Sequence, residues 1–137
     1  MAEARRCPVT FAQLILSDQD SGEPLDTAPF HHEWHDLIGA NTVTSILAGP
    51  ELGKTQSITI ARTIWELGRN PDLRCGIFSA KQANAENMLR AIREHIEQNP
   101  LVREVFPKLR PSPDPGQPWP SDQITIERTI VSPNASV

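Results

Sequence analysis

The triplet Gly53-Lys54-Thr55 has the residue types and order of a phosphate-binding loop. The strict pattern is a glycine, four further residues and then Gly-Lys-Ser/Thr, in which backbone N–H groups surround the phosphates. The lysine adds a positive charge at the β- and γ-phosphates, and the threonine hydroxyl binds Mg²⁺. Ala48 stands where the pattern has its first glycine, and Gly49 comes one position later. These residues predict a site for ATP, with Mg²⁺ attached through Thr55.

The predicted contacts involve most of the loop and the first residue after it. Gly53 lets a phosphate approach the backbone closely, because no side chain stands in the way. Pro50 has no N–H to donate, and Glu51 brings a negative charge close to the phosphates. A chance Gly-Lys-Thr triplet in a turn before a helix is the alternative. The predicted nucleotide-binding residues are Gly49, Glu51, Leu52, Gly53, Lys54, Thr55 and Gln56.

The segments around the loop predict an α/β fold. Residues 43–48 are β-branched and apolar and end at a Gly-Pro pair, which is typical of a buried strand followed by a turn. Further strands are expected over 73–80 and 123–131, and amphipathic helices over 55–68 and 82–98. Strands that alternate with helices indicate a parallel sheet with helices on its faces. We therefore expect a three-layer, P-loop NTPase-like parallel sheet, incomplete at its C-terminal side.

Shorter helices are expected outside this central pattern. Residues 9–17 and 30–40 each have the apolar spacing of a short helix. Asn99 and Pro100 form a typical N-cap and first-turn pair for another helix, which continues to Phe106. His31 and His35 share a face of the helix over 30–40, with a spacing that can bind a metal. No third ligand is evident, so we expect an ordinary polar helix there.

Composition and charge limit the class of protein. The chain has 137 residues, which suffice for one small domain with a core but not for a motor ATPase with a second catalytic domain. The net charge of −4 argues against tight DNA binding by this chain alone. Cys7 and Cys75 lack metal-type spacing and fit a reducing intracellular compartment. The longest apolar stretch, residues 11–16, is too short to span a bilayer.

With the loop placed, the chain resembles the N-terminal part of a bacteriophage terminase large subunit, the ATPase that packages DNA into a procapsid. The resemblance covers about residues 29–137, and only the phosphate loop within it has a specific chemistry. It rests on Pro29–Trp34, Ala48–Thr55, Ile64–Pro71, Phe78–Gln98, Asn99–Arg110, Trp119 and Ile124–Arg128. It also implies a division into an N-terminal helix and linker (residues 1–29) and a partial P-loop ATPase domain (residues 30–137).

The resemblance implies function and partners. Its cofactors are ATP and Mg²⁺, and its partners are double-stranded DNA, a small terminase subunit and a portal protein, with no membrane. The cytoplasm of an infected or lysogenic bacterial host is the implied location. Family members are ATPases that also carry an endonuclease. No strand ending in paired carboxylates of the Walker B type follows Thr129, so we predict no catalytic residue and expect no hydrolysis by this chain alone.

Two other classes of function stay open at this point. One is a different nucleic-acid motor, such as a helicase-like P-loop ATPase. The other is a non-functional prophage remnant. Phe30 and Trp34 precede the loop in the position where the family often places an aromatic residue near the adenine base. We expect both rings to pack their helix onto the edge of the sheet rather than to contact a base.

Overall fold

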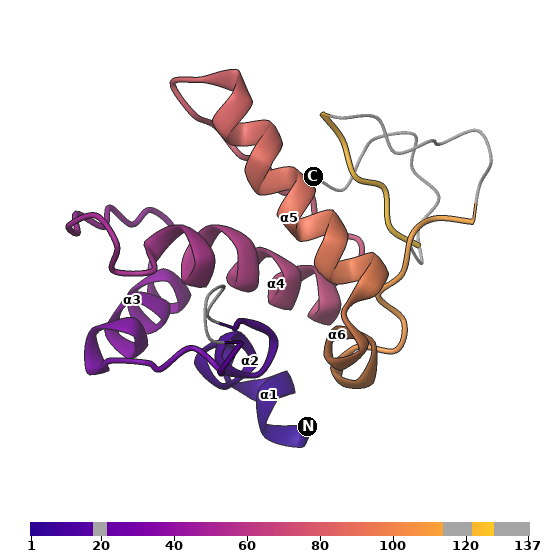
Figure 1. The fold of residues 1–137 in the computed structure, drawn as a ribbon, viewed down its shortest axis with the longest axis horizontal. Coiled ribbons are helices and arrows are strands. Elements are labelled where there is room, and N and C mark those ends of the chain that lie inside the picture. Colours follow the sequence, from indigo (N-terminus) through magenta and orange to yellow (C-terminus); the bar gives the residue numbers. More distant parts are fainter. Residues whose placement is uncertain (18–21, 114–121, 128–137) are drawn as a thin grey trace.

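A computed structural model of the chain describes residues 1–17, 22–113 and 122–127. Over these residues the chain is helical and forms no sheet (Figure 1). The elements in chain order are α1 (Ala2–Arg6), α2 (Pro8–Ile15), α3 (Pro29–Ala40), the π-helix η1 (Thr55–Arg62), α4 (Thr63–Arg69), α5 (Gln82–Gln98) and α6 (Pro100–Val105). The expected three-layer α/β sheet is therefore wrong.

The segments of the first two expected strands have no regular secondary structure and pair with no other described segment. Val43 and Leu47 are 88% and 95% exposed, and Phe78 is 95% exposed. The expectation of a buried strand over 43–48 is thus wrong as well. Side chains of these types favour an extended backbone, but burial and strand pairing are properties of the tertiary structure. Within the described part of the chain, neither segment has the neighbour that a sheet needs.

The third expected strand is reduced to a single bridge. Ile126 pairs with Pro111 in antiparallel fashion. The Ser112 N–H donates to the Thr125 oxygen at 2.9 Å, and the Glu127 N–H donates to the Arg110 oxygen at 2.9 Å. Residues 128–131 of the expected strand lie outside the described residues. This short pairing holds a buried apolar segment against the helices, since Ile124 and Ile126 are 0% and 1% exposed.

The helices expected from periodicity are confirmed. Residues 82–98 form α5 with the expected bounds, and the helix expected over 55–68 is present as η1 followed by α4. Asn99 caps α6 as expected, because its side chain accepts a hydrogen bond of 3.0 Å from the Leu101 N–H. The short helix α1 was not expected. Its carbonyl at Ala4 accepts from the Trp65 indole N–H at 3.0 Å, which attaches α1 to α4.

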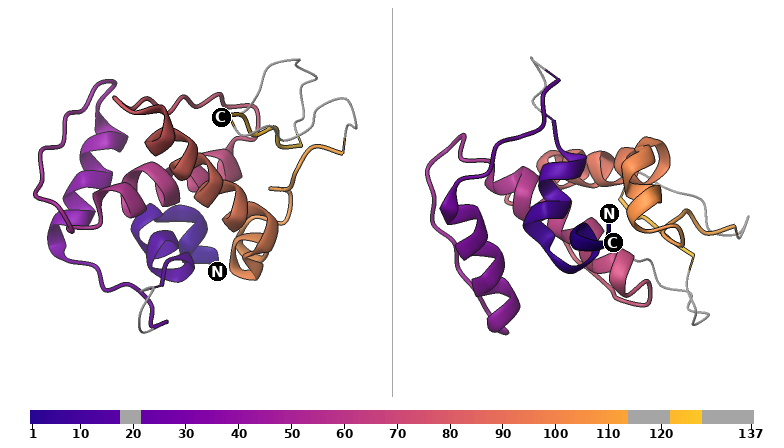
Figure 2. Two further views of the ribbon diagram at one scale, coloured as in Figure 1. Left: turned by 45° about the horizontal axis from the view of Figure 1, so that its top comes forward. Right: turned by 90° about the horizontal axis from the view of Figure 1, so that it is seen from below.

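The continuous helix formed by η1 and α4 lies at the centre of the molecule. It contacts α2 and α3 on one side and α5 on the other (Figure 1). Figure 2 shows α3 at one edge of the bundle and α6 beside the end of α5. The largest fully buried side chains are Phe11, Ile64, Leu67, Ile92, Ile96, Val102, Val105, Ile124 and Ile126. As the sequence suggested, both faces of the central helix are covered, so its residues make up much of the core.

Candidate functional site

The loop over Ala48–Thr55 enters the central helix through two residues with left-handed backbone. Glu51 has φ of 64° and Gly53 has φ of 71°. Glycine adopts such angles without penalty, whereas a residue with a Cβ is strained there. The Gly53 carbonyl accepts the Ser57 N–H at 2.8 Å, so the helical hydrogen bonds begin at Gly53. The N–H groups of the three residues between Gly53 and Ser57 precede that bond and are free of intrahelical partners.

Lys54 folds back over the loop. Its ammonium Nζ donates to the Ala48 carbonyl oxygen at 3.4 Å, although the two residues are six positions apart. The lysine side chain is half-buried, and the neighbouring Thr55 is exposed at the start of η1. The positive charge of the lysine therefore lies at the same end of the helix as the N–H groups that have no partner within the helix. That end of a helix also carries the positive end of the helix dipole.

The other predicted residues divide between the loop surface and a cavity beside it. Gly49 is exposed on the loop. Glu51, Leu52, Gly53 and Gln56 line a cavity of about 320 Å³. Its remaining lining residues come from α2, from the segment that leads into α3, from the start of α3 and from η1; they are Ala12, Gln13, Leu16, Leu25, Asp26, Thr27, Ala28, Phe30, His31 and Ser57. The structure thus brings most of the predicted residues together at one place.

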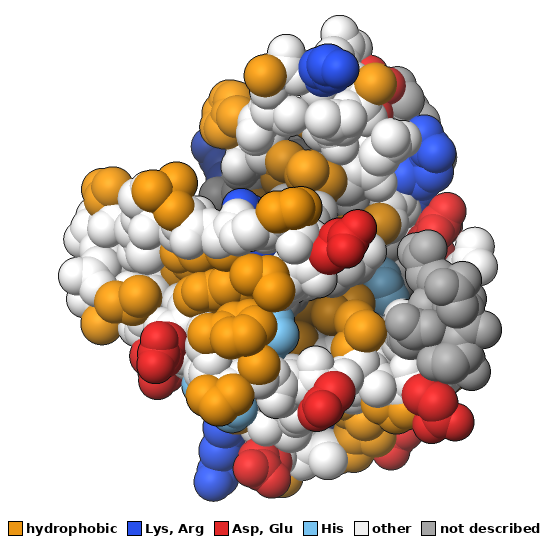
Figure 3. All heavy atoms as spheres, turned by 60° about the vertical axis from the view of Figure 1, so that its left-hand side comes forward, with side chains coloured by type: hydrophobic (Ala, Val, Ile, Leu, Met, Phe, Trp, Pro, Cys, Tyr) orange, Lys and Arg blue, Asp and Glu red, His pale blue; other side chains and the backbone are white. Residues whose placement is uncertain are grey.

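Figure 3 shows the face of the molecule that carries α3 and the loop. Hydrophobic side chains gather on this face, with histidine side chains among them. The exposed large hydrophobic residues Leu37, Val43, Leu47 and Leu52 belong to α3 and to the segment and loop that follow it. The Thr44 hydroxyl donates to the Leu37 carbonyl at 3.3 Å, which attaches the segment after α3 to that helix.

His31 connects the start of α3 to the loop. Its Nδ1 accepts the Ala28 N–H at 2.9 Å, so the ring proton is on Nε2. Nε2 lies 3.0 Å from the Leu52 carbonyl oxygen and donates to it. The ring packs against Phe30 and Trp34, with centroids 4.4 and 5.1 Å away, and those two rings also contact each other at 5.0 Å. His31 therefore fixes the position of the loop relative to the helix that precedes it.

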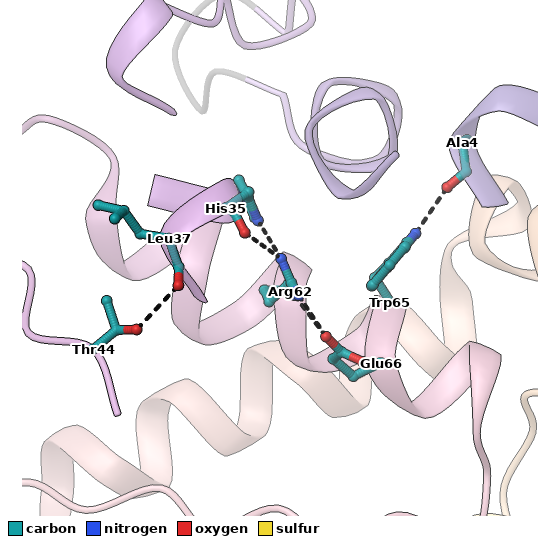
Figure 4. Close-up of polar contacts among 7 residues, drawn as sticks. All are labelled: Ala4, His35, Leu37, Thr44, Arg62, Trp65 and Glu66. Carbon is teal, nitrogen blue, oxygen red and sulfur yellow. Dashed lines mark hydrogen bonds and ion pairs between the residues drawn. The ribbon is translucent and has the colours of Figure 1, made fainter. Parts of the chain in front are cut away.

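A chain of polar contacts, buried at His35 and Arg62, joins α3 to the central helix (Figure 4). The Arg62 guanidinium contacts Glu66 Oε1 at 2.7 Å through Nη2 and at 2.8 Å through Nε. Nη1 of Arg62 donates to His35, both to Nδ1 at 3.3 Å and to the carbonyl oxygen at 3.1 Å. The chain of contacts continues from His35 to Ser57, which lies on η1 five residues before Arg62.

The π-helix explains how two η1 side chains reach one histidine. His35 Nε2 lies 3.0 Å from the Ser57 hydroxyl, while Nδ1 faces Arg62. In a π-helix each residue is hydrogen-bonded to the fifth residue along the chain. Ser57 and Arg62 are five positions apart and therefore lie on one face of η1, toward α3. An α-helix would place the fifth residue further round the helix.

His35 is neutral over the physiological pH range. Burial first, and the charge of Arg62 second, lower the pKa of its imidazole from 6.5 to about 4, while the charge of Asp36 opposes them. The side chain is 2% exposed. A guanidinium can only donate hydrogen bonds, so Nδ1 of His35 accepts from Arg62 and the ring proton is on Nε2.

The expectations for the histidines and aromatic residues of α3 have mixed outcomes. Trp34 is buried, with 8% exposed, whereas Phe30 lines the cavity. The described residues form no sheet, so the expectation that both rings pack on the edge of a sheet is wrong. Both histidines at the metal-type spacing, His31 and His35, have hydrogen-bonding partners in α3, the loop or η1. Among the described residues, no group of three or more His, Cys, Asp and Glu side chains is placed to hold a metal ion. The Mg²⁺ role of Thr55 stays a prediction, because in that role the nucleotide supplies further ligands.

Sequence reasoning missed the residues that support the loop. His31 and His35 were identified for their spacing but assigned no partner. Ser57 and Arg62 were given no role, although polar residues within a helix that is covered on both faces are a signal of buried hydrogen bonding. Their contacts join residues more than 20 positions apart in the chain, so periodicity along one helix could not reveal them.

The chain matches no protein-family model, and comparison with curated proteins and with solved structures found no significant match. The part of the chain that the structure describes contains no helix with both the length and the apolar character needed to cross a membrane.

Proposed function

We propose that the loop over Ala48–Thr55 binds the triphosphate of ATP. The observation that carries the proposal is the position of Lys54, whose Nζ crosses the loop to the Ala48 carbonyl at the N-terminal end of the central helix. The lysine charge, the N–H groups without a partner in the helix and the helix dipole then act on the same anion. The proposal depends on the loop and its helix and needs no sheet.

The chemistry of the loop suits a triphosphate with its metal ion. The N–H groups of Lys54, Thr55 and Gln56 are available to phosphate oxygens, because they precede the first helical hydrogen bond. The exposed Thr55 hydroxyl is the donor that the resemblance assigns to Mg²⁺. Bound Mg²⁺ would neutralise part of the phosphate charge. The loop residues would orient the triphosphate, and Gly53 would let it approach the backbone.

The cavity beside the loop supports a place for the nucleoside. Its volume of about 320 Å³ is at the lower end of the range of about 300–1,000 Å³ for small-molecule sites. The lining combines the Phe30 ring with aliphatic side chains such as Leu25 and Leu52. Such a lining suits a flat, mostly apolar ring. A ligand that spans the cavity and the loop would therefore have a ring at one end and phosphates at the other.

The wider function follows from the resemblance to terminase large subunits. In this proposal the chain is the nucleotide-binding part of a DNA-packaging motor in the cytoplasm of an infected or lysogenic bacterium. Double-stranded DNA, a small terminase subunit and a portal protein are its proposed partners. The proposal covers ATP binding and assigns no residue to hydrolysis.

Titration with a fluorescent ATP analogue in the presence of Mg²⁺ tests the binding site. We expect Lys54→Ala to weaken binding by about 10- to 100-fold, the usual effect of losing a hydrogen bond to a charged group. Lys108→Ala is the matched control, because it removes the same charge from an exposed residue after α6. Equal binding by the wild-type and Lys54→Ala proteins would show that the loop is not the phosphate site.

A further inference from the structure

Ser57 lies where the cavity meets the chain of polar contacts between α3 and the central helix. Its side chain lines the cavity, yet the residue is only 7% exposed. It comes two positions after Thr55, on the η1 face that is directed toward α3. A phosphate bound at the N-terminal end of η1 would therefore not reach Ser57. Another part of the same ligand that occupies the cavity would lie next to the Ser57 side chain.

The hydrogen bonds around His35 determine what the Ser57 hydroxyl can do. Arg62 occupies Nδ1 of His35 as a donor, so Nε2–H donates to the Ser57 oxygen at 3.0 Å. The hydroxyl proton of Ser57 is consequently directed away from His35. Among the described residues, no acceptor forms a hydrogen bond with that proton. His35 also has no free lone pair with which to accept it, which argues against Ser57 as an activated nucleophile.

We propose that Ser57 is a specificity-determining residue, whose hydroxyl donates a hydrogen bond to an acceptor atom of a nucleobase in the cavity. This inference rests on the proposed function of the loop. In the same arrangement His35 is a positioning residue, which directs the Ser57 proton, and Arg62 holds His35 in the required tautomer. Glu66 in turn holds Arg62 through two contacts to one oxygen.

The cavity lining favours a nucleobase as the bearer of that acceptor. Phe30 offers a ring face, and Leu16, Leu25 and Leu52 offer aliphatic surface. Asp26 and Glu51 also line the cavity and would repel a second anionic group there. Ring nitrogens and carbonyl oxygens of the bases are neutral acceptors. A donor fixed by buried partners discriminates well against a ligand that lacks the acceptor.

Comparison of ATP with inorganic tripolyphosphate tests the inference, because tripolyphosphate keeps the phosphates and lacks the base. Calorimetric titration should show that Ser57→Ala weakens ATP binding by about tenfold and leaves tripolyphosphate binding unchanged. Ser57→Thr keeps a hydroxyl and should keep the preference for ATP. His35→Gln keeps an N–H donor and should also retain that preference, whereas His35→Leu should reduce it.

A ligand-side measurement avoids any effect of the substitutions on folding. Titration of the wild-type protein with 1-deaza-, 3-deaza- and 7-deaza-ATP should identify one ring nitrogen whose removal weakens binding by about tenfold. The inference is overturned if all three analogues bind like ATP, or if Ser57→Ala weakens ATP and tripolyphosphate equally. If the wild-type protein binds neither ATP nor tripolyphosphate, the proposed function itself fails, and this inference fails with it.

Discussion

The Nε2 atom of His31 lies 3.0 Å from the carbonyl oxygen of Leu52, while Nδ1 of the same ring accepts the Ala28 N–H. One imidazole therefore joins Ala28, the residue before α3, to Leu52 in the loop, which lies 21 positions after His31 in the chain. The loop contains the left-handed residues Glu51 and Gly53. A loop with such a backbone keeps one conformation only if its surroundings hold it.

Replacement of His31 is expected to loosen the loop. His31→Leu removes both hydrogen bonds, while the leucine side chain keeps part of the packing against Phe30 and Trp34. The free energy of unfolding should therefore fall by about 1–2 kcal/mol. Affinity for ATP should fall as well, because the loop loses its fixed position. Urea denaturation and nucleotide titration measure the two effects. His32→Leu is the control, since His32 is exposed on the same helix; equal losses in the two variants would contradict the supporting role of His31.

Replacement of Glu51 separates charge from backbone strain. Glu51→Gln removes the negative charge beside the loop and should strengthen ATP binding several-fold, since charges close to a partly buried site are weakly screened. Glu51→Gly also relieves the cost of φ at 64°, which is about 1–2 kcal/mol for a residue with a Cβ. Part of that gain is lost through the greater freedom of glycine in the unfolded chain. The midpoint temperature of thermal unfolding should therefore rise in Glu51→Gly but not in Glu51→Gln. Weaker ATP binding by Glu51→Gln than by the wild-type protein would contradict the predicted position of the phosphates.

The buried imidazole of His35 predicts a loss of stability in acid. Its pKa is lowered to about 4 in the folded protein, from 6.5. Between these values the unfolded chain binds a proton that folded His35 does not, so the free energy of unfolding decreases as the pH falls from 6.5 to 4. At 1.36 kcal/mol per pKa unit, the contribution is on the order of 3 kcal/mol. Urea denaturation at a series of pH values measures it.

A variant isolates the contribution of His35 from that of the half-buried His95. Burial also lowers the pKa of His95, against the opposing charge of Glu94, so His95 changes stability in the same direction. His35→Gln leaves His95 unchanged and should flatten the pH dependence between 6.5 and 4. An unchanged pH dependence in this variant would mean that His35 is not buried as a neutral group.

Replacement by alanine is expected to have opposite effects on stability at the two helical glycines Gly68 and Gly39. A Cβ on Gly68 would lie 2.4 Å from the Phe106 ring, whereas a Cβ on Gly39 would meet only Arg62 Nη2, at 3.9 Å. Gly68→Ala should therefore lower the free energy of unfolding by about 1–3 kcal/mol through overpacking. Gly39→Ala should raise it by up to about 1 kcal/mol, because alanine is the better helix former. Similar midpoints of thermal unfolding for the two variants would contradict the packing of α4 against Phe106.

The sequence by itself determined the elements whose signals are local. The apolar period of residues 82–98 defines α5, and the Asn99-Pro100 pair defines the start of α6, because capping and amphipathic spacing act within one or two turns. The order Gly53-Lys54-Thr55 likewise marks the loop that precedes the central helix.

Only the tertiary structure decided what the segments of the expected strands and the buried polar residues do. Residues 43–48 have the composition of a strand, yet Val43 and Leu47 face solvent, since a strand is stabilised by neighbours that local sequence does not specify. The contacts of His35 with Ser57 and Arg62 arise where α3 packs on η1. They depend on the π-helical turn that brings residues five apart onto one face of η1, and they join residues that are more than 20 positions apart in the chain.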